Sequence, residues 1–377
     1  MTMNMWAAGK RGTKERGIEI LRYGRRRLMS TFVDREPTVT GILYPRRRLL
    51  GASPHSVAIY CRVLYCLASF FAFLPLSAHA QTPQIDREAV FQKALPLYQY
   101  DSTKPLAVRR GVTQTIAGGT VSLERFSYLS TNNQRVPALL FTPNGVSAAR
   151  PVPCIVILHG LGGSKEIMAG YALAMAKFGY ASLVIDEYGQ GERGPLKTAP
   201  GRQAEQLAAT VLQSAVDVRR GLDFLQTRPE IDGKRLGLAG VSLGAIIGTV
   251  ASGVEPRLKA AVLISGGGDW GLILKTLSAR SATVGGRDTS AFKKVNFAQL
   301  SALLAPEDPL TFAPHIAPRP VLMLGGRKDT TIVPQAQLEL FEALKQPKQS
   351  VWYPQYGHVP PPEVVFPAMQ KFFAKSL

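Results

Sequence analysis

Two hydrophobic patterns alternate along the chain from about residue 150 onward. Short uninterrupted apolar runs predict strands that are buried on both faces, at residues 153–160, 180–186, 235–240, 258–266, 319–326 and 350–354. Between them, apolar residues recur every three or four positions, which predicts helices at residues 164–177, 204–225, 244–252, 334–344 and 363–376. Strands that alternate with helices predict an α/β fold with a mostly parallel sheet covered by helices on both faces.

A different pattern precedes this region. Residues 120–130 and 135–143 contain many β-formers, and the polar stretch "TNNQ" lies between them. Two strand-like runs joined by a short turn predict an antiparallel hairpin. We expect this hairpin to begin the sheet.

The first eighty residues predict targeting rather than fold. The apolar run at residues 63–76 has the length of a signal-peptide core, follows the basic residues Arg46, Arg47, Arg48 and Arg62, and ends in "SAHA". We therefore expect cleavage before Gln81 and a periplasmic or secreted product. The run is too short for a stable membrane anchor. Residues 1–45 exceed an ordinary leader, which a start codon assigned too far upstream would explain.

Charge supports this division of the chain. The formal net charge is +19, and residues 1–80 hold 13 Lys/Arg against 4 Asp/Glu, so +9 of the total lies in the predicted leader. Basic residues in the rest of the chain are scattered, without a basic stripe or interleaved aromatic residues. This distribution argues against a nucleic-acid partner.

Cysteine usage fits an exported protein that does not depend on disulfides. Of the three cysteines, only Cys154 lies after residue 80, so the mature chain cannot form an internal disulfide. Cys154 sits within an apolar run, which predicts a buried core position rather than a reactive thiol.

Candidate chemistry begins with "GVSLG" at residues 240–244, between a predicted strand and a predicted helix. In this context the G-x-S-x-G pattern predicts a sharp turn that exposes the Ser242 hydroxyl at the carboxyl edge of the sheet. Gly240 and Gly244 leave room for the strand and helix backbones to approach each other. Ser242 is therefore the candidate nucleophile.

A serine nucleophile needs a base and a group that orients the base. His358 follows the last predicted strand, and Asp329 follows the strand at residues 319–326, so both are delivered to the same edge as Ser242. The order serine, acid, histidine is that of a hydrolase triad. Asp269, which follows the strand at residues 258–266, is the alternative acid. Of the other two histidines after residue 80, His315 is expected at the surface or in packing.

With these motifs the chain resembles the alpha/beta-hydrolase superfamily, and most closely its dienelactone-hydrolase-like and prolyl-oligopeptidase-like esterase and peptidase branches. The resemblance rests on "HGLGG" (159–163), "DEYGQGERG" (186–194), "GVSLG" (240–244), "GGRKD" (325–329) and "YGH" (356–358). It implies one alpha/beta-hydrolase domain over residues 81–377. It also implies an oxyanion hole formed by the backbone N–H groups of Leu161 and Leu243, with His159 shaping that loop.

The expected activity is cleavage of a small-molecule carboxylic ester through an acyl-enzyme, with no metal and no cofactor. The same triad also serves serine peptidases and acyltransferases, and a non-catalytic binding protein on the same scaffold is a further alternative. The sequence leaves the acyl group, the alcohol and the oligomeric state open.

Residues 269–317 form a connection that is longer than usual, so we expect part of it to form a small helical cap over the pocket. Trp270, Leu272, Leu274 and Leu277 either line such a cap or pack in the core. At another strand end, Glu187, Tyr188, Glu192 and Arg193 either contact substrate or belong to a solvated loop.

Overall fold

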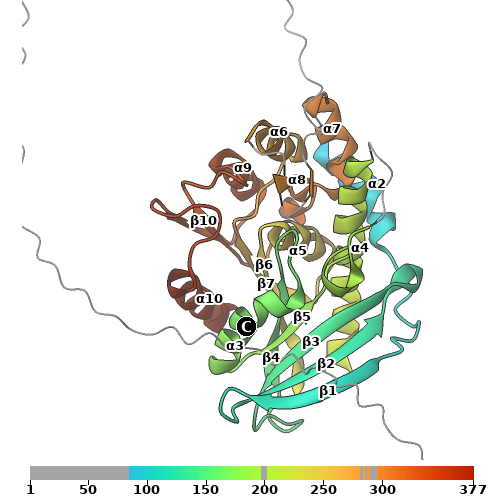
Figure 1. Cartoon of the computed structure of the whole chain (residues 1–377), viewed down its shortest axis with the longest axis vertical. Coiled ribbons are helices and arrows are strands. Elements are labelled where there is room, and N and C mark those ends of the chain that lie inside the picture. The colour runs from blue at the N-terminus through green and yellow to red at the C-terminus, as the bar shows by residue number, and fades with distance from the viewer. Residues whose placement is uncertain (1–84, 197–201, 281–282, 285–286, 289–294) are drawn as a thin grey trace, which may run out of the picture. The chain divides into compact units, whose positions relative to one another are not determined.

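The computed structural model describes residues 85–196, 202–280, 283–284, 287–288 and 295–377 (Figure 1). The leader and signal peptide that we predict for residues 1–80 lie outside the described residues. Their boundary with the hydrolase domain therefore stays a prediction. Within the described ranges, no helix is both long enough and apolar enough to cross a membrane.

A nine-stranded sheet organises the described residues. Its strands are β1 (Arg109–Ile116), β2 (Val121–Leu129), β3 (Arg135–Pro143), β4 (Val152–Leu158), β5 (Ala181–Ile185), β6 (Ile231–Val241), β7 (Leu258–Ile264), β10 (Val321–Gly326) and β11 (Lys348–Tyr353). They lie in the order β1-β2-β3-β5-β4-β6-β7-β10-β11. Neighbours from β5 to β11 pair in parallel, whereas β1, β2 and β3 pair antiparallel with each other and β3 pairs antiparallel with β5. The sheet is mostly parallel, as the sequence predicted.

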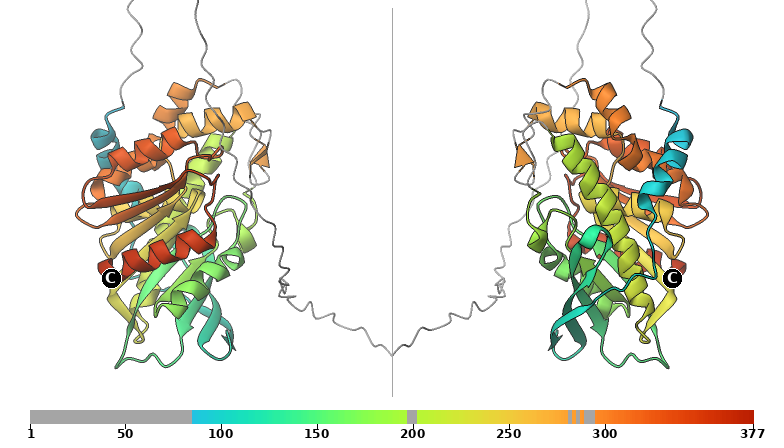
Figure 2. Two further views of the ribbon diagram at one scale, coloured as in Figure 1. Left: turned by 90° about the vertical axis from the view of Figure 1, so that its left-hand side faces the viewer. Right: turned by 90° about the vertical axis from the view of Figure 1, so that its right-hand side faces the viewer.

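Helices cover both faces of this sheet. The helices of the described residues are α2 (Arg87–Ala94), α3 (Ala169–Lys177), α4 (Gln203–Gln226), α5 (Leu243–Val254), α6 (Trp270–Arg280), α7 (Phe297–Leu303), α8 (Pro309–Phe312), α9 (Pro334–Ala343) and α10 (Pro362–Ser376), and some of them cover the sheet. One face packs against α3 and α10, and the other packs against α4 and α5 (Figure 2). The alpha/beta-hydrolase fold is thereby confirmed.

Alternate residues of the central strands face the cores on opposite sides of the sheet. In β4, Cys154 and Val156 belong to the core beneath α4 and α5, whereas Ile155 and Ile157 belong to the core beneath α3 and α10. This alternation follows from the pleat of a strand. Cys154 is fully buried, and burial raises the pKa of its thiol to about 12. It is a core residue, as expected.

The structure adds two elements that the hydrophobic pattern did not predict. The predicted hairpin is present as β2 and β3, but β1 precedes it and forms the edge of the sheet. Seven of the eight residues of β1 are exposed, so it has no apolar alternation to detect. The short helix α2 buries only Phe91 and Ala94, which is too little for a periodic signal.

Residues 269–317 contain α6, α7 and α8, which Figure 1 shows grouped together, and the two-residue strands β8 (Thr283–Val284) and β9 (Arg287–Asp288). Trp270 and Leu274 are buried in the same core as α4 and α5, and Leu272 and Leu277 pack against it. Core packing therefore describes these four apolar side chains. That part of the segment acts as a cap over a pocket stays a prediction.

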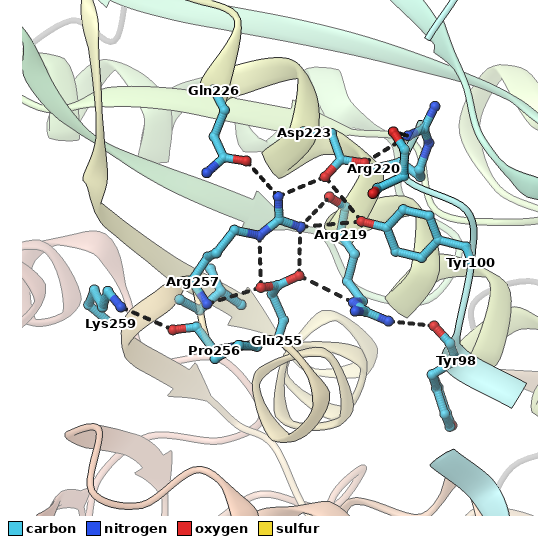
Figure 3. A network of polar contacts seen from close by, with 12 residues as sticks. Tyr98, Tyr100, Arg219, Arg220, Asp223, Gln226, Glu255, Pro256, Arg257 and Lys259 are labelled. Atoms are coloured by element: carbon cyan, nitrogen blue, oxygen red, sulfur yellow. Dashed lines mark hydrogen bonds and ion pairs between the residues drawn. The ribbon is translucent and has the colours of Figure 1, made fainter. Parts of the chain in front are cut away.

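The residues around Tyr98 and Tyr100, before β1, are held at the amino edge of the parallel strands by a network around Arg257 (Figure 3). Arg257 Nε and Nη2 donate to the two carboxylate oxygens of Glu255 at 2.9 and 2.7 Å. Its Nη1 donates to Asp223 Oδ1 at 2.7 Å, and its Nη2 also donates to the Tyr100 hydroxyl at 3.3 Å. The network joins residues before β1 to α4 and to the turn before β7.

Candidate active site

Ser242 lies on a strained turn between β6 and α5. Its φ of 57° and ψ of −117° put a non-glycine residue in the left-handed half of the map. Such a conformation costs about 1–3 kcal/mol and persists only where surrounding contacts enforce it. Here the Ser242 N–H donates to the Ile264 carbonyl at 2.8 Å, and the Ser242 carbonyl accepts from Ala245 at 2.9 Å. The turn is held on both sides.

The two glycines of this turn are required by close backbone approach. A Cβ on Gly240 would lie 2.2 Å from the Gly244 carbonyl oxygen, and a Cβ on Gly244 would lie 2.5 Å from the His159 carbonyl oxygen. Both contacts are with backbone, which cannot swing away. The sequence-based expectation for these glycines is confirmed.

His358 follows β11 and bridges Ser242 and Asp329. Its Nε2 lies 2.8 Å from Ser242 Oγ, and its Nδ1 lies 2.8 Å from Asp329 Oδ2. Because an ionised carboxylate only accepts, the neutral ring carries its proton on Nδ1 and leaves Nε2 to accept from the serine hydroxyl. The imidazole is about a quarter exposed, with a relative accessibility of 27%. The structure thus brings together all three predicted triad residues.

The backbone of His358 is fixed by a neighbouring strand end. Ser265, which directly follows β7, donates its hydroxyl to the His358 carbonyl. Ser265 has a φ of 52°, and its own N–H donates to the Leu324 carbonyl at 2.7 Å. Gly326 permits this loop to approach, since a Cβ there would lie 2.0 Å from the Gly357 carbonyl oxygen.

Asp329 is almost completely buried and accepts several hydrogen bonds. Its Oδ1 accepts from the backbone N–H groups of Thr331 at 2.8 Å and Ile332 at 3.0 Å. Its Oδ2 accepts from His358 and also from Gln337 Nε2 at 2.9 Å. Only 3% of its surface is exposed. These donors replace the water that the carboxylate has lost.

Asp269 is not placed against His358. Its Oδ1 accepts from the Gly271 N–H at 2.9 Å, from the Leu272 N–H at 3.3 Å and from the Ser301 hydroxyl at 2.6 Å. These bonds cap the start of α6 and tie it to α7. The geometry therefore favours Asp329 over Asp269 as the partner of the histidine.

The predicted oxyanion loop lies beside Ser242. A Cβ on Gly160 would lie 3.5 Å from Ser242 Cβ, so the loop and the turn are in contact. Within the described part of the chain, no protein acceptor is found for the N–H of Leu161 or of Leu243. Leu243 is the first residue of α5, where unpaired N–H groups and the helix dipole favour negative charge.

His159 and Gln190 shape this loop. Burial lowers the pKa of the His159 ring, whose Nε2 accepts from the Glu187 N–H at 3.3 Å and whose Nδ1 lies 2.9 Å from the Gly160 carbonyl oxygen. These contacts define a neutral ring with its proton on Nδ1. Gln190 Oε1 accepts from the Gly162 N–H at 2.5 Å. His159 is structural, as expected. Gln190 belongs to the stretch "DEYGQGERG", but no role was predicted for it.

An open groove of about 520 Å³ adjoins the same loop. It is lined by Gly162, Gly163, Ser164, Glu166, Ile167, Gly191 and Glu192. Lys165 is buried behind it and donates to Asp186 Oδ2 at 2.8 Å and to Glu192 Oε1 at 2.5 Å. Ser242 and His358 do not line this groove, which lies on the far part of the loop, at Gly162 and Gly163.

The remaining residues of "DEYGQGERG" have separate environments. Glu187 is fully buried, and burial together with the neighbouring Asp186 raises the pKa of its carboxyl well above the usual range. Arg193 is buried as well and donates to Asp217 Oδ2 at 2.5 Å. These two side chains are structural, and Glu192 is the acid of this stretch that lines the groove. Tyr188 is partly buried, and its ring contacts the Arg193 guanidinium.

His315 packs against an aromatic ring. The His315 ring stacks on Phe91 with ring centroids 3.4 Å apart, which is the packing role expected of it. Among the described residues, no group of three or more His, Cys, Asp or Glu side chains is arranged to hold a metal ion.

Gln337 and Ser265 contact the triad but were missed by the sequence reasoning. Gln337 lies on the buried face of α9 with Ala336 and Leu340, so a polar residue on an apolar helix face was the available signal. Ser265 follows a buried strand at the edge where Ser242 and Asp329 lie. A positive φ cannot be read from a serine in a sequence, so Ser265 gave no signal of its own.

Comparison with known proteins identifies the family of the chain. Residues 136–359, more than half of the chain, match the Dienelactone hydrolase family. Esterase YjfP of Escherichia coli K12 is 24% identical over 247 residues, which cover 64% of this chain and 96% of that protein. The uncharacterised YcjY of the same organism is 28% identical over 144 residues, 37% of this chain, and the match spans only 44% of that protein.

Among solved structures, the acetyl xylan esterase from Paenibacillus sp. R4 superposes with a TM-score of 0.64 at 23% identity. The superposition covers 78% of this chain and 95% of that one, which shows a shared fold. The family and the esterase relatives support an enzyme that hydrolyses esters. By its sequence over residues 136–359, the chain belongs to the dienelactone hydrolase family.

Proposed function

We propose that the protein is a serine carboxylesterase in which Ser242 is the nucleophile, His358 the general base and Asp329 the residue that orients the base. One observation carries the proposal. His358 lies 2.8 Å from Ser242 Oγ through Nε2 and 2.8 Å from Asp329 Oδ2 through Nδ1. These distances are within the range required for proton transfer and for orientation of the ring.

The reaction proceeds in two halves. Ser242 Oγ attacks the ester carbonyl as its proton moves to His358 Nε2, and the protonated ring then gives that proton to the departing alkoxide. In the second half, water attacks the acyl-serine while His358 accepts its proton, and the carboxylic acid leaves as the proton returns to Ser242. Asp329 remains ionised and stabilises the imidazolium in both halves.

Negative charge develops on the substrate oxygen in each half. The N–H groups of Leu161 and Leu243, which no protein acceptor occupies in the described part of the chain, are the proposed donors to this oxyanion. A preorganised donor of this kind stabilises the transition state by about 3 kcal/mol. Because Leu243 begins α5, the helix dipole adds to this stabilisation.

The test compares Ser242→Ala with a matched control, Ser147→Ala, in an exposed loop. Hydrolysis of p-nitrophenyl acetate and butyrate by Ser242→Ala should fall by about 10⁴-fold or more. Labelling by a fluorophosphonate should also be lost in that variant, and Ser147→Ala should match the wild type in both assays. An unchanged melting temperature would show that the loss is chemical. Substantial ester hydrolysis by folded Ser242→Ala would refute the proposal.

The same panel separates the alternatives that use this triad. Dipeptide nitroanilides test a peptidase, and an added alcohol that captures the acyl group tests an acyltransferase. Acetylated xylan belongs in the panel because the Paenibacillus structure with the same fold is an acetyl xylan esterase. Binding of an ester without any turnover would favour a non-catalytic binding protein.

We also propose that the enzyme acts outside the cytoplasm, after cleavage before Gln81. The support is the apolar run at residues 63–76, which follows arginines and precedes small residues. Expression of the full chain in a bacterial host, followed by N-terminal mass analysis of the periplasmic and medium fractions, should give a product that begins near Gln81. Retention of residues 1–80 in a cytoplasmic product would contradict this.

A further inference from the structure

We propose that Gln337 is a positioning residue that holds the Asp329 carboxylate in the orientation His358 needs. The inference rests on the proposed function, because it gives Gln337 a role only if Asp329 orients a catalytic base. Gln337 lies on α9, a helix that supplies none of the triad residues, and its side chain is fully buried.

Gln337 donates to the same Asp329 oxygen as His358. Gln337 Nε2 lies 2.9 Å from Asp329 Oδ2, and His358 Nδ1 lies 2.8 Å from that atom. The second proton of the Gln337 amide points to the Ile332 carbonyl, 2.7 Å away. One NH₂ group therefore bridges the catalytic acid and the loop that follows it.

The orientation of the amide is fixed by chemistry. Asp329 Oδ2 and the Ile332 carbonyl are both acceptors, so only the NH₂ side of Gln337 can face them. Gln337 Oε1 then has no hydrogen-bond partner, although it is buried. It packs against Gly325, where a Cβ would lie 2.0 Å from it.

This unpaired oxygen argues against a packing role. A buried acceptor without a partner destabilises the folded state, and leucine or methionine would fill a similar volume without that cost. A glutamine at this position is useful through its NH₂ group, which donates to Asp329. The buried amide is therefore explained by what it does for the carboxylate.

The donors around Asp329 divide between its two oxygens. Thr331 and Ile332 hold Oδ1 through their N–H groups, and Gln337 with His358 holds Oδ2. If Gln337 is removed, His358 is left as the donor to Oδ2, and the carboxylate can turn about its Cβ–Cγ bond. We expect the imidazole to lose its fixed orientation more often, with a direct effect on the chemical step.

The experiment compares Gln337→Met, Gln337→Glu and a control, Gln335→Met. Gln335 is on the same helix but exposed, where it contacts Glu339. For Gln337→Met we expect kcat on p-nitrophenyl acetate to fall about 10- to 100-fold, by analogy with the loss of hydrogen-bond partners that orient metal ligands. KM should stay within about twofold because the substrate does not touch Gln337. Gln335→Met should match the wild type.

Gln337→Glu keeps the shape of the side chain and adds a pH signature. At low pH the new carboxyl is protonated and can donate to Asp329, whereas at higher pH two carboxylates face each other in a buried site. Its kcat should therefore decline on the alkaline side, where the wild type and Gln337→Met show no such decline. A residue that only packs would change the melting temperature without producing this limb.

Two failures are distinguishable. If folded Ser242→Ala remains active, the proposed triad is wrong and the role of Gln337 falls with it. If Ser242→Ala is inactive while Gln337→Met keeps the wild-type kcat, or Gln337→Glu keeps the wild-type pH profile, the triad stands and the positioning role is overturned.

Discussion

The two edges of the parallel strands differ in how their polar groups are held: one by charge pairing, the other by strained backbone turns. At the amino edge, the network around Arg257 pairs buried charges with opposite ones (Figure 3). At the carboxyl edge, Ser242, Ser265 and Asp269 adopt φ angles between 52° and 59°. Strain of this kind is concentrated at functional sites. The comparison indicates that one edge contributes stability and the other holds reactive groups in place.

Two buried glutamates differ in whether a cation pairs with them. Burial alone would raise the pKa of Glu255 at the amino edge, but hydrogen bonds from Arg257 outweigh burial and lower it. Glu307 lies near the start of α6, where its carbonyl accepts from the Trp270 indole. Burial raises the pKa of its carboxyl to about 7, and no basic side chain among the described residues pairs with it. Comparable burial thus has opposite consequences because only one acid has a cation.

The largest expected effect is on catalysis at the carboxyl edge. Asp329→Asn should lower kcat by about 10⁴-fold, because an amide in this position favours the wrong tautomer of the histidine. Asp269→Asn should change kcat less than about threefold, since asparagine caps a helix as well as aspartate does. Steady-state kinetics on one nitrophenyl ester decides between them. The reverse ranking would transfer the acid role to Asp269.

A smaller effect is expected on stability at the amino edge. Arg257→Met leaves Glu255 and Asp223 without their shared cation, which should reduce the free energy of unfolding by about 2–3 kcal/mol. The kcat of the folded variant should remain unchanged, because the network lies at the edge opposite Ser242. Urea denaturation measures the loss.

Arg202→Met is the matched control for that experiment. Arg202 pairs with Glu205 on an exposed part of α4, so its loss should cost no more than about 0.5 kcal/mol. Equal destabilisation by both substitutions would show that the buried Arg257 network adds no more to the free energy of unfolding than an exposed ion pair does. A large loss of kcat in folded Arg257→Met would contradict the conclusion that the amino edge contributes only to stability.

The smallest expected effect is a dependence of stability on pH. An unfolded glutamate titrates near 4.3, so the raised pKa of Glu307 makes the folded state bind more protons between about pH 4 and 7. Its contribution therefore falls as pH rises through that window. Glu255 has the opposite sign: its contribution is present above about pH 4 and is lost as pH falls through its lowered pKa.

Glu307→Gln should thus raise the melting temperature more at pH 8 than at pH 5. Thermal denaturation of wild type and variant at the two pH values checks this, with Glu339→Gln on α9 as the control. An equal shift at both values would mean that Glu307 is not the source of the pH dependence.

Most of the central sheet could be predicted because buried parallel strands are continuous apolar runs. The triad residues could be predicted because strand ends, motif spacing and the order along the chain coincide at Ser242, Asp329 and His358. The edge strand β1 gave no signal, because exposed residues have no periodicity. The role of Gln337 could not be predicted, because its contact with Asp329 depends on how α9 packs beside the loop after β10.

Cys154 has a practical consequence. It is the only cysteine after residue 80, and its buried thiol has a pKa of about 12, so it stays protonated and unreactive towards maleimides. A form that begins near Gln81 therefore has no thiol that reacts with maleimides. A cysteine introduced at exposed Val359, next to His358, would be the sole labelling site, and a fluorophore there would report ligand entry at the triad.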